Sequence, residues 1–382
     1  MNWKVPLFDL DIGDAEREAV NRVLDSRWLT MGEEVQAFEK DFAVQVGGGS
    51  AVAVANCTAA LHLCLRAMEI GPGDEVLCPS LNFCAGPNAI TSLGAKVVFT
   101  DVTSTKDLCI SPEDIAAKVT PRTKAIMVMH YAGYPCDMDA IQGLACEYGL
   151  RVIEDAAHAP GASLDGRPCG SLGDAACFSF YSNKNMSTGE GGMVTTRDDT
   201  LSARLRRLRS HGMTASTLHR HKGHAFSYDL VEPGYNYRLD EMRAAMGRVQ
   251  LSRLVGFNER RAELVAAYHR ELAGAEGISL PFVSHRGTPA YHIMPVLLDP
   301  GIDREKFMQA MRGAGIQTSI HYPPSHLFGW YRQCEPELSL PVTEDVAVRE
   351  VTLPLFASME AKQVGMVCEA IRGYFKRIGR AA

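Results

Sequence analysis

The sequence lacks the long apolar runs and the targeting pattern that mark membrane and secreted proteins. Its 382 residues contain no stretch near the roughly 20 consecutive apolar residues that span a bilayer, so we expect no membrane insertion. The start, Met-Asn-Trp-Lys-Val-Pro-Leu-Phe-Asp-Leu, has no basic region followed by a long apolar region, so no secretory signal is predicted. We therefore expect a cytoplasmic protein.

Regular cysteine spacing and blocks of positive charge are also missing. The 11 cysteines are odd in number and form no Cys-x-x-Cys pair, which predicts reduced, mostly buried thiols and neither a disulfide framework nor a metal site. The formal net charge is −6, and no block of five basic residues occurs. Nucleic acid is therefore a poor candidate partner.

What the sequence does contain is an alternation of strand-like and helix-like segments. Helical spacing appears at 111–117 and 138–148, between short apolar runs that follow turn residues. Such runs are typical of the buried strands of a mainly parallel sheet, and they fall at 71–79, 94–101, 122–130, 149–155 and 175–180. The alternation predicts a large, doubly wound α/β domain.

The C-terminal part begins with a long amphipathic pattern. Apolar residues at i, i+3, i+4 and i+7 predict a connecting helix over 241–272. The following segments predict a strand at 291–298, then helices at 304–314 and 360–378. We predict a large domain at 1–240, including the N-terminal segment, the connecting helix at 241–272, and a small α+β domain at 273–382.

Lys184 is the first candidate for chemistry. It lies in the polar, glycine-rich segment Ser-Asn-Lys-Asn-Met-Ser-Thr-Gly-Glu-Gly-Gly, between two apolar runs. Loops at strand ends often carry catalytic residues. A lysine whose pKa is lowered by burial can form a Schiff base with an aldehyde cofactor, whereas a lone loop lysine is usually a solvated charge. The neighbouring motifs therefore decide between the two interpretations.

Two further motifs accompany this lysine. Asp155 ends the apolar run Val-Ile-Glu-Asp, where a carboxylate can keep a pyridine nitrogen protonated; a helix cap is the alternative. Thr58 opens a helix after an apolar run, and the N–H groups and hydroxyl at such a helix start suit a phosphate. Many helices begin with threonine and bind nothing, so this motif alone is weak.

Together the motifs resemble the DegT/DnrJ/EryC1/StrS aminotransferase family nearly from end to end. They are Asn-Cys-Thr-Ala-Ala-Leu-His-Leu, Gly-Pro-Gly-Asp-Glu-Val, His-Tyr-Ala-Gly-Tyr-Pro, Val-Ile-Glu-Asp-Ala-Ala-His, Phe-Ser-Phe-x-x-x-Lys-x-x-x-x-Gly-Glu-Gly-Gly and Gly-Tyr-Asn-Tyr-Arg. The resemblance implies a fold type I, aspartate-aminotransferase-like enzyme that uses pyridoxal 5′-phosphate, with pyridoxamine 5′-phosphate as an intermediate form. It also implies a homodimer with shared active sites that transfers an amino group from L-glutamate to a keto-sugar nucleotide.

The resemblance assigns roles around the cofactor ring. Lys184 would form the Schiff base and move protons, and Asp155 would pair with the pyridinium nitrogen. Phe83 would stack on the ring, with a buried core phenylalanine as the alternative. His158 would lie beside the ring and its phenolic oxygen, with a structural histidine as the alternative.

The resemblance also assigns the phosphate and substrate contacts. Thr58, Ala59 and Ser179 would bind the phosphate, and Asn236 would reach it from the partner subunit. Segments that line the substrate pocket in the family contribute five candidates here, namely Trp28, Thr30, His321, Tyr322 and His326. Two departures affect the expected pocket: Cys57 replaces a commoner glycine in the phosphate turn, and Leu-Asn-Phe-Cys-Ala replaces the usual Thr-Phe-x-Ala-Thr pattern.

Two charged or histidine-rich stretches suggest weaker hypotheses. The spacing of His211, His219, His221 and His224 matches no common zinc pattern, so a solvated or substrate-facing loop is preferred to a metal site. A short helical stretch carries Arg204, Arg206, Arg207 and Arg209, which could attract a substrate diphosphate, although solvated surface charge is the preferred interpretation.

The same residues bear on the alternative functions of such a chain. Relatives that dehydrate a deoxysugar with pyridoxamine phosphate carry histidine where this chain has Lys184, which favours amino transfer. A keto-cyclitol is the alternative acceptor. A binding protein that kept the fold is disfavoured by the joint presence of Lys184, Asp155, Phe83, Thr58 and Ser179. A nucleotide-dependent reductase would need Gly-x-Gly-x-x-Gly after the first strand, and the chain has Gly-Gly-Gly before a strand instead.

Overall fold

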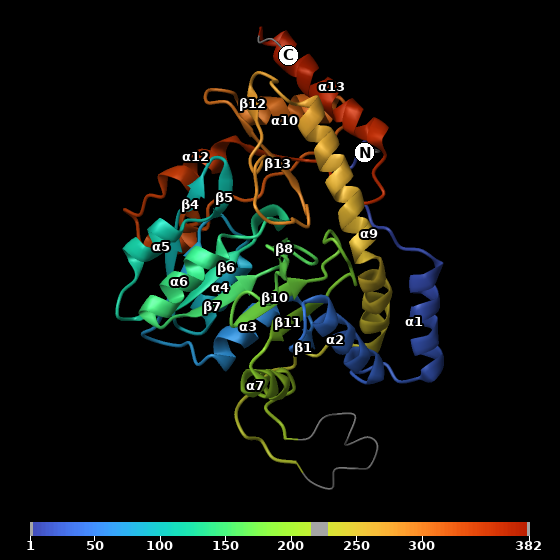
Figure 1. The fold of residues 1–382 in the computed structure, drawn as a ribbon, viewed down its shortest axis with the longest axis vertical. Coiled ribbons are helices and arrows are strands. Elements are labelled where there is room, and N and C mark those ends of the chain that lie inside the picture. The colour runs from blue at the N-terminus through green and yellow to red at the C-terminus, as the bar shows by residue number, and fades with distance from the viewer. Residues whose placement is uncertain (1–2, 215–227, 380–382) are drawn as a thin grey trace.

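The computed structural model describes residues 3–214 and 228–379, which are organised around a seven-stranded sheet (Figure 1). Only β11 runs antiparallel to its neighbours, and the other neighbouring strands are parallel. In spatial order the strands are β1 (Ser50–Val54), β11 (Gly192–Thr196), β10 (Ala175–Ser179), β7 (Arg151–Asp155), β6 (Thr123–Met129), β2 (Glu75–Pro79) and β3 (Lys96–Thr100). This confirms the predicted mainly parallel sheet.

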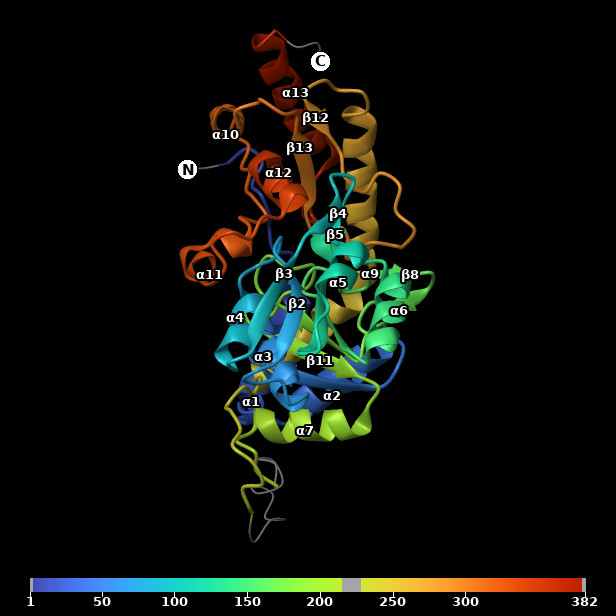
Figure 2. The ribbon, with the colours of Figure 1, turned by 90° about the vertical axis from the view of Figure 1, so that its left-hand side faces the viewer.

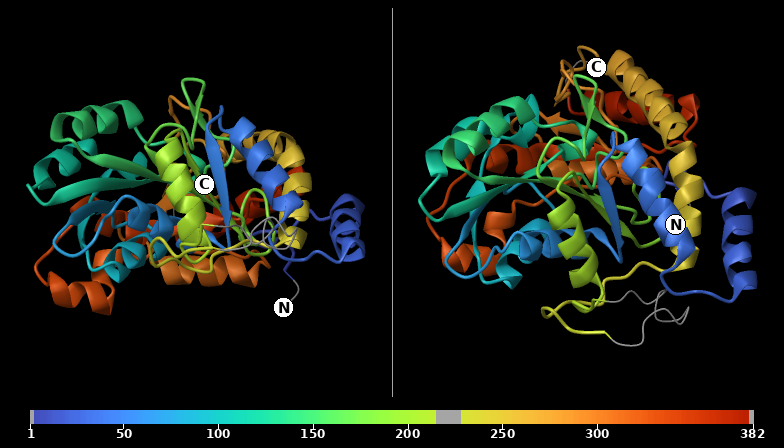
Figure 3. Two further views of the ribbon diagram at one scale, coloured as in Figure 1. Left: turned by 90° about the horizontal axis from the view of Figure 1, so that it is seen from below. Right: turned by 60° about the horizontal axis from the view of Figure 1, so that its bottom comes forward.

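Both faces of the sheet are buried, because helices cover each of them (Figure 3). Successive side chains of a strand point to opposite faces, so Ile126 and Val128 of β6 enter one core, and Ala125 and Met127 enter the other. The first core is closed by α2 (Glu33–Gln45), α5 (Pro112–Lys118), α6 (Met138–Tyr148) and part of α9 (Glu241–Glu271). The second is closed by α3 (Cys57–Ala67), α4 (Ala85–Ser92) and α7 (Asp199–Arg209).

Local capping explains why the helix predictions match the structure closely. The side chain of Asp137 accepts the Ala140 N–H at the start of α6, and Gly149 ends that helix with a φ of 66°. Ser111 caps α5, so the helix predicted at 111–117 runs one residue later, to Lys118.

The helix α9 runs along much of the molecule and connects its two ends (Figure 1). Asp240 caps it, as the predicted boundary requires. Its first half packs on α1 (Asp14–Ser26) and α2, and its second half packs on α13 (Ala361–Arg377). Beside its start, the buried Glu241 carboxylate accepts three backbone N–H groups from the beginning of α2, at 2.8 to 2.9 Å.

A three-stranded antiparallel sheet organises the C-terminal part, in the order β12 (Ile278–Ser279), β13 (Met294–Leu298) and β14 (Glu350–Leu353). It packs with α10 (Arg304–Gly313) and α13 around a core of its own. The strand predicted from 291 begins only at Met294, because Tyr291 has a φ of 51° that no strand residue adopts. Val5 also joins this core, so the first residues lie with the C-terminal part. The three domain boundaries stay a prediction.

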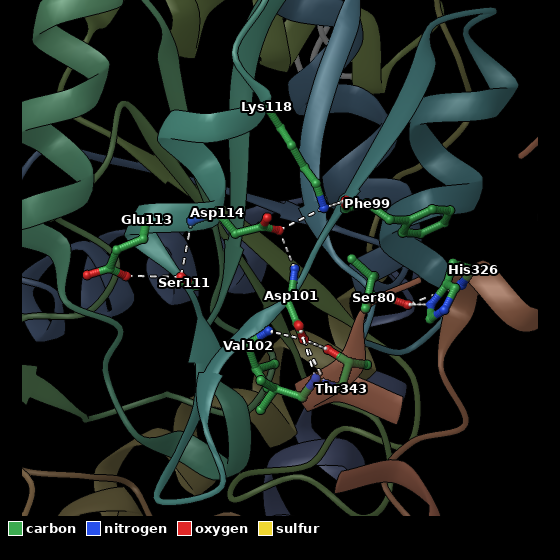
Figure 4. A network of polar contacts seen from close by, with 12 residues as sticks. Ser80, Phe99, Asp101, Val102, Ser111, Glu113, Asp114, Lys118, His326 and Thr343 are labelled. Atoms are coloured by element: carbon green, nitrogen blue, oxygen red, sulfur yellow. Dashed lines mark hydrogen bonds and ion pairs between the residues drawn. The ribbon is translucent and has the colours of Figure 1, made fainter. Parts of the chain in front are cut away.

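Contacts with the edge of the central sheet tie the C-terminal part to the large one (Figures 2 and 4). The Asp101 carboxylate, just after β3, accepts the N–H and hydroxyl of Thr343 at 2.7 and 2.6 Å. Thr343 lies at the start of α12 (Pro341–Arg349), so Asp101 stabilises that helix from outside. Nearby, His326 Nδ1 lies 2.6 Å from the Ser80 hydroxyl, just before the short α11 (Gly329–Cys334).

The remaining elements are short hairpins and single turns. They are β4 (Val102–Ser104) with β5 (Asp107–Ile110), β8 (Ser163–Leu164) with β9 (Arg167–Pro168), and the 3₁₀ turns at Tyr131–Gly133 and Ser325–Leu327. All 11 cysteines are free, and most are buried, as expected. Among the described residues, no helix is both long and apolar enough to cross a membrane.

Candidate active site

A cavity of about 500 Å³ lies where several strands of the central sheet end. Its walls come from the carboxyl ends of β6, β7 and β10, from the start of α3, and from the C-terminal part. In open parallel sheets, ligands bind at this edge. The lining includes eight residues predicted from the sequence, namely Thr58, Phe83, Asp155, His158, Ser179, Lys184, His321 and Tyr322.

Lys184 follows β10 in a turn that its N–H closes on the Tyr181 carbonyl at 2.9 Å. Burial lowers the pKa of the Lys184 amine to about 8, although the nearby Asp155 and Cys57 oppose that change. A substantial share of this amine is therefore neutral near physiological pH. A neutral amine is the form that attacks an aldehyde.

Asp155 ends β7 and is 4% exposed. One of its oxygens accepts the Ala157 N–H at 3.2 Å. Burial raises the pKa of the Asp155 carboxyl, while the Ala157 N–H and the neighbouring Lys184 lower it. The site thus places a buried carboxylate at the end of β7 and a partly buried amine in the turn after the adjacent β10.

The turn before α3 offers donors for an anion. The Asn56 side chain accepts the Ala59 N–H at 2.8 Å, so Ala59 is engaged in the cap and does not line the cavity. Cys57 and Thr58 do line it, and their N–H groups lie in the first turn, where no intrahelical acceptor exists. Gly192 packs against this turn so closely that a Cβ there would lie 2.6 Å from the Asn56 carbonyl carbon. Glycine in β11 thus permits the strand to lie against the turn without displacing it.

Aromatic and hydroxyl groups complete the walls. Phe83 is 55% exposed and its ring centroid lies 5.8 Å from that of Tyr322, so it is no core phenylalanine. The Tyr322 hydroxyl lies 3.0 Å from His158 Nε2, while the buried Nδ1 of His158 has no hydrogen-bond partner. Burial lowers the pKa of His158 well below its usual value. Ser179, at the end of β10, accepts the Tyr181 N–H at 3.3 Å.

His321 is held from behind by the C-terminal sheet. Its N–H donates to a Glu350 oxygen at 2.8 Å, and its Nδ1 lies 2.8 Å from the Thr352 hydroxyl. Burial and the charge of Lys184 lower the pKa of His321 to about 3, so the ring is neutral. Burial also raises the pKa of Glu350 to about 8.

Four other predicted residues do not line the cavity of this single chain. Trp28 packs beside Gly32, and Thr30 and Asn236 are exposed. The buried His326 ring has its Nδ1 2.6 Å from the Ser80 hydroxyl (Figure 4). Its Nε2 lies 3.2 Å from a Glu344 oxygen. His326 therefore acts as a structural link in this chain.

The arginines of α7 are bound to acidic side chains of the same chain. Arg204 binds Glu69 and Glu232, while Arg206 and Arg209 both bind Glu39. In these ion pairs the carboxylates already neutralise the positive charge that would attract a substrate diphosphate. His211 is exposed, and the other three histidines of the predicted loop, His219, His221 and His224, lie outside the described residues.

Several lining residues were not predicted from the sequence. Asn82, Asn183, Tyr181 and Glu190 line the cavity, and the buried His292 lies behind it, with Nε2 3.4 Å from the Lys184 amine. A histidine inside the apolar run Tyr-His-Ile-Met-Pro-Val-Leu-Leu was the only available signal for His292.

Comparison with known proteins decides the family. The model of the DegT/DnrJ/EryC1/StrS aminotransferase family matches residues 10–372. The chain belongs to this family. It is 40% identical over 372 residues to the spore coat polysaccharide biosynthesis protein SpsC of Bacillus subtilis (strain 168), with 96% of this chain and 95% of that protein covered.

Solved structures of aminotransferases support the same family assignment. DesV of S. venezuelae, solved in complex with a ketimine intermediate, is 37% identical with a TM-score of 0.90, covering 97% of this chain and 98% of DesV. DesI, solved in the presence of its TDP-sugar product, is 34% identical with a TM-score of 0.86, covering 96% and 93% of the two chains. The chain thus has the fold of pyridoxal-phosphate-dependent aminotransferases and is an aminotransferase with that cofactor.

The residues of the cavity fit this cofactor. A helix start with unused N–H groups suits its phosphate, a buried carboxylate suits its ring nitrogen, and an exposed aromatic ring suits its flat face. The buried Nδ1 of His158, which lacks a partner, adds a polar group that a ligand could engage.

Proposed function

We propose that this aminotransferase transfers an amino group from L-glutamate to a keto group of a nucleotide-linked sugar. The observation that carries the proposal is a partly buried Lys184 amine of lowered pKa near the Asp155 carboxylate, at the sheet edge where ligands bind. The similarity to DesI, which was solved in the presence of its TDP-sugar product, supports a nucleotide-linked acceptor.

Bound pyridoxal phosphate supplies an electron sink that stabilises negative charge on the carbon next to the amino group. Lys184 holds the cofactor covalently and moves a proton at its Nζ, for which a pKa of about 8 is well matched. Asp155 holds the ring nitrogen in its protonated form. Thr58 and Ser179 bind the phosphate together with the N–H groups at the start of α3.

Phe83 and His158 position the ring within the cavity. Phe83 presents an exposed aromatic face to it, and His158 is oriented by the Tyr322 hydroxyl. His321 and Tyr322 come from the C-terminal part and form one wall of the cavity. Because His321 is buried, Tyr322 is partly buried and both side chains are neutral, they suit the uncharged hydroxyl and keto groups of a sugar ring.

The acceptor and donor are tested by following the visible absorption of the bound cofactor in both half-reactions. L-Glutamate should convert the protein to its pyridoxamine phosphate form, and a keto-sugar nucleotide should reverse the change. The acceptor panel includes matched keto-cyclitols without a nucleotide. Reversal by the cyclitols alone would overturn the proposed acceptor, and conversion by other amino acids but not by glutamate would overturn the proposed donor.

We also propose a homodimer in which Asn236 completes the partner's site. Asn236 and Thr30 are exposed and lie outside the cavity of their own chain, which leaves them available to a second subunit. The N-terminal region exposes several large apolar side chains, as a subunit interface would require: Phe8, Leu10, Ile12, Leu24 and Leu29.

Mixed subunits test this arrangement. A dimer of one Lys184→Ala chain and one Asn236→Ala chain contains one fully intact site if the sites are shared. After subunit exchange, about half of the dimers are mixed, so the mixture should regain about a quarter of the wild-type activity. Activity equal to the average of the two parents would show that each chain completes its own site.

A further inference from the structure

His292 lies directly behind Lys184, on the side away from the cavity. Its Nε2 is 3.4 Å from the Lys184 amine, a long hydrogen bond of the kind found in catalytic sites without substrate. The ring is 3% exposed and is not part of the cavity lining. His292 therefore touches the catalytic amine without reaching a ligand in the cavity.

Two asparagines determine which nitrogen of this ring carries the proton. Asn258 donates its Nδ2 to the Pro160 carbonyl at 2.9 Å, which leaves its oxygen to accept from Asn185 Nδ2 at 2.8 Å. Asn185 Nδ2 also donates to the Ala290 carbonyl at 2.6 Å. The Asn185 oxygen must then face His292 Nδ1, 2.9 Å away. Because an amide oxygen only accepts, Nδ1 of His292 carries the hydrogen.

The second nitrogen of the ring is consequently without a proton. Burial, together with the nearby His158 and Lys184, lowers the pKa of His292 well below its usual value, so the ring is neutral and has a single N–H. That N–H is engaged with Asn185. Nε2 can therefore accept a hydrogen bond from Lys184 but cannot donate one.

We infer that His292 is a positioning residue that accepts one N–H of Lys184 and so leaves the lone pair of the amine directed to the cavity. A neutral amine has two N–H groups and one lone pair. A donor at this position would engage the lone pair, whereas an acceptor engages an N–H and keeps the nucleophile available. The inference rests on the proposed role of Lys184 as the amine that binds the cofactor.

The proton position can be measured directly in cofactor-free protein labelled with ¹⁵N-histidine. Nuclear magnetic resonance should show a hydrogen on Nδ1 of His292 and none on Nε2, with the signals assigned by their loss in His292→Gln. His285 is the matched comparison, because its Nδ1 accepts the Gly287 N–H at 3.0 Å and its Nε2 donates to the Pro135 carbonyl at 2.9 Å. It should show the opposite tautomer. A hydrogen on Nε2 of His292 overturns the inference.

Capture of pyridoxal phosphate by cofactor-free protein tests the consequence. His292→Leu should slow capture about tenfold, the effect of losing one hydrogen bond, and His292→Gln should restore most of the rate because its side-chain oxygen can accept. His285→Leu should leave the rate unchanged. An unchanged capture rate in His292→Leu overturns the inference, and so does an equal loss of rate in His292→Leu and His292→Gln. Covalent capture by Lys184→Ala would instead overturn the proposed function, while the tautomer result would stand.

Discussion

Replacing Asp155 with asparagine should lower the pH at which the Lys184 amine becomes reactive. The nearby carboxylate raises the pKa of Lys184, whereas burial lowers it to about 8. Removing the negative charge leaves the lowering effect of burial unopposed by Asp155, so the pKa falls further. The neutral amine then becomes abundant at a lower pH than in the wild type.

The size of the effect follows from the pKa. With a pKa of about 8, about a tenth of the Lys184 amine is neutral at pH 7. In the unfolded chain, a lysine with a pKa of about 10.4 has only a few neutral amines in ten thousand, which is roughly 250-fold fewer. The Asp155→Asn variant can therefore gain at most about tenfold in neutral amine at pH 7, because the wild type already has a tenth.

Competitive labelling of the cofactor-free protein with acetic anhydride measures this quantity, since only neutral amines react. The Lys184 peptide is quantified by mass spectrometry from about pH 6 to about pH 11, with urea-unfolded protein as the reference. Asp139→Asn, which changes an exposed carboxylate remote from the cavity, is the matched control and should leave the inflection in place. Two results would contradict the predicted effect of Asp155 and burial on the pKa of Lys184. One is a labelling inflection for wild-type Lys184 near that of the unfolded chain, and the other is an inflection at higher pH in Asp155→Asn.

Three further variants probe the supports of the site. Glu241→Gln should lower the free energy of unfolding in urea by about 2 kcal/mol, because the amide cannot replace both oxygens that accept N–H groups from α2. Asp101→Ala should cost about 1 to 2 kcal/mol in the same assay, because Thr343 loses its acceptor; unchanged midpoints would contradict both predictions. Gly192→Ala should raise the dissociation constant for pyridoxal phosphate by about tenfold or more, because its Cβ would displace the Asn56 turn, and an unaltered titration would count against this.

The parts of the fold that the sequence predicted well are those governed by local signals. Helix α6 has an Asp137 cap and a Gly149 stop, and its observed bounds equal the predicted ones. The strand before Lys184 is a nearly continuous apolar run, which is typical of buried parallel strands. Tyr291 shows the limit of such patterns, because its left-handed backbone interrupts an apolar run that otherwise predicts a longer strand.

For other residues, the sequence did not predict their position relative to the cavity. His326 lies five positions after His321 in one motif, yet His321 lines the cavity while His326 is bound to Ser80. His292 is 108 positions from Lys184, and only the folded chain brings the two together. The role of Asn236 stays a prediction, since it depends on a second subunit.

The most direct test of the central claim is to locate the covalent link between protein and cofactor. The protein is loaded with pyridoxal phosphate, reduced with borohydride, digested and mapped by mass spectrometry. The reduced cofactor should be attached to the peptide containing Lys184, and Lys184→Ala should carry no such attachment. A cofactor fixed to any other lysine, or an unchanged attachment in Lys184→Ala, would contradict the assignment of Lys184 as the residue that binds the cofactor.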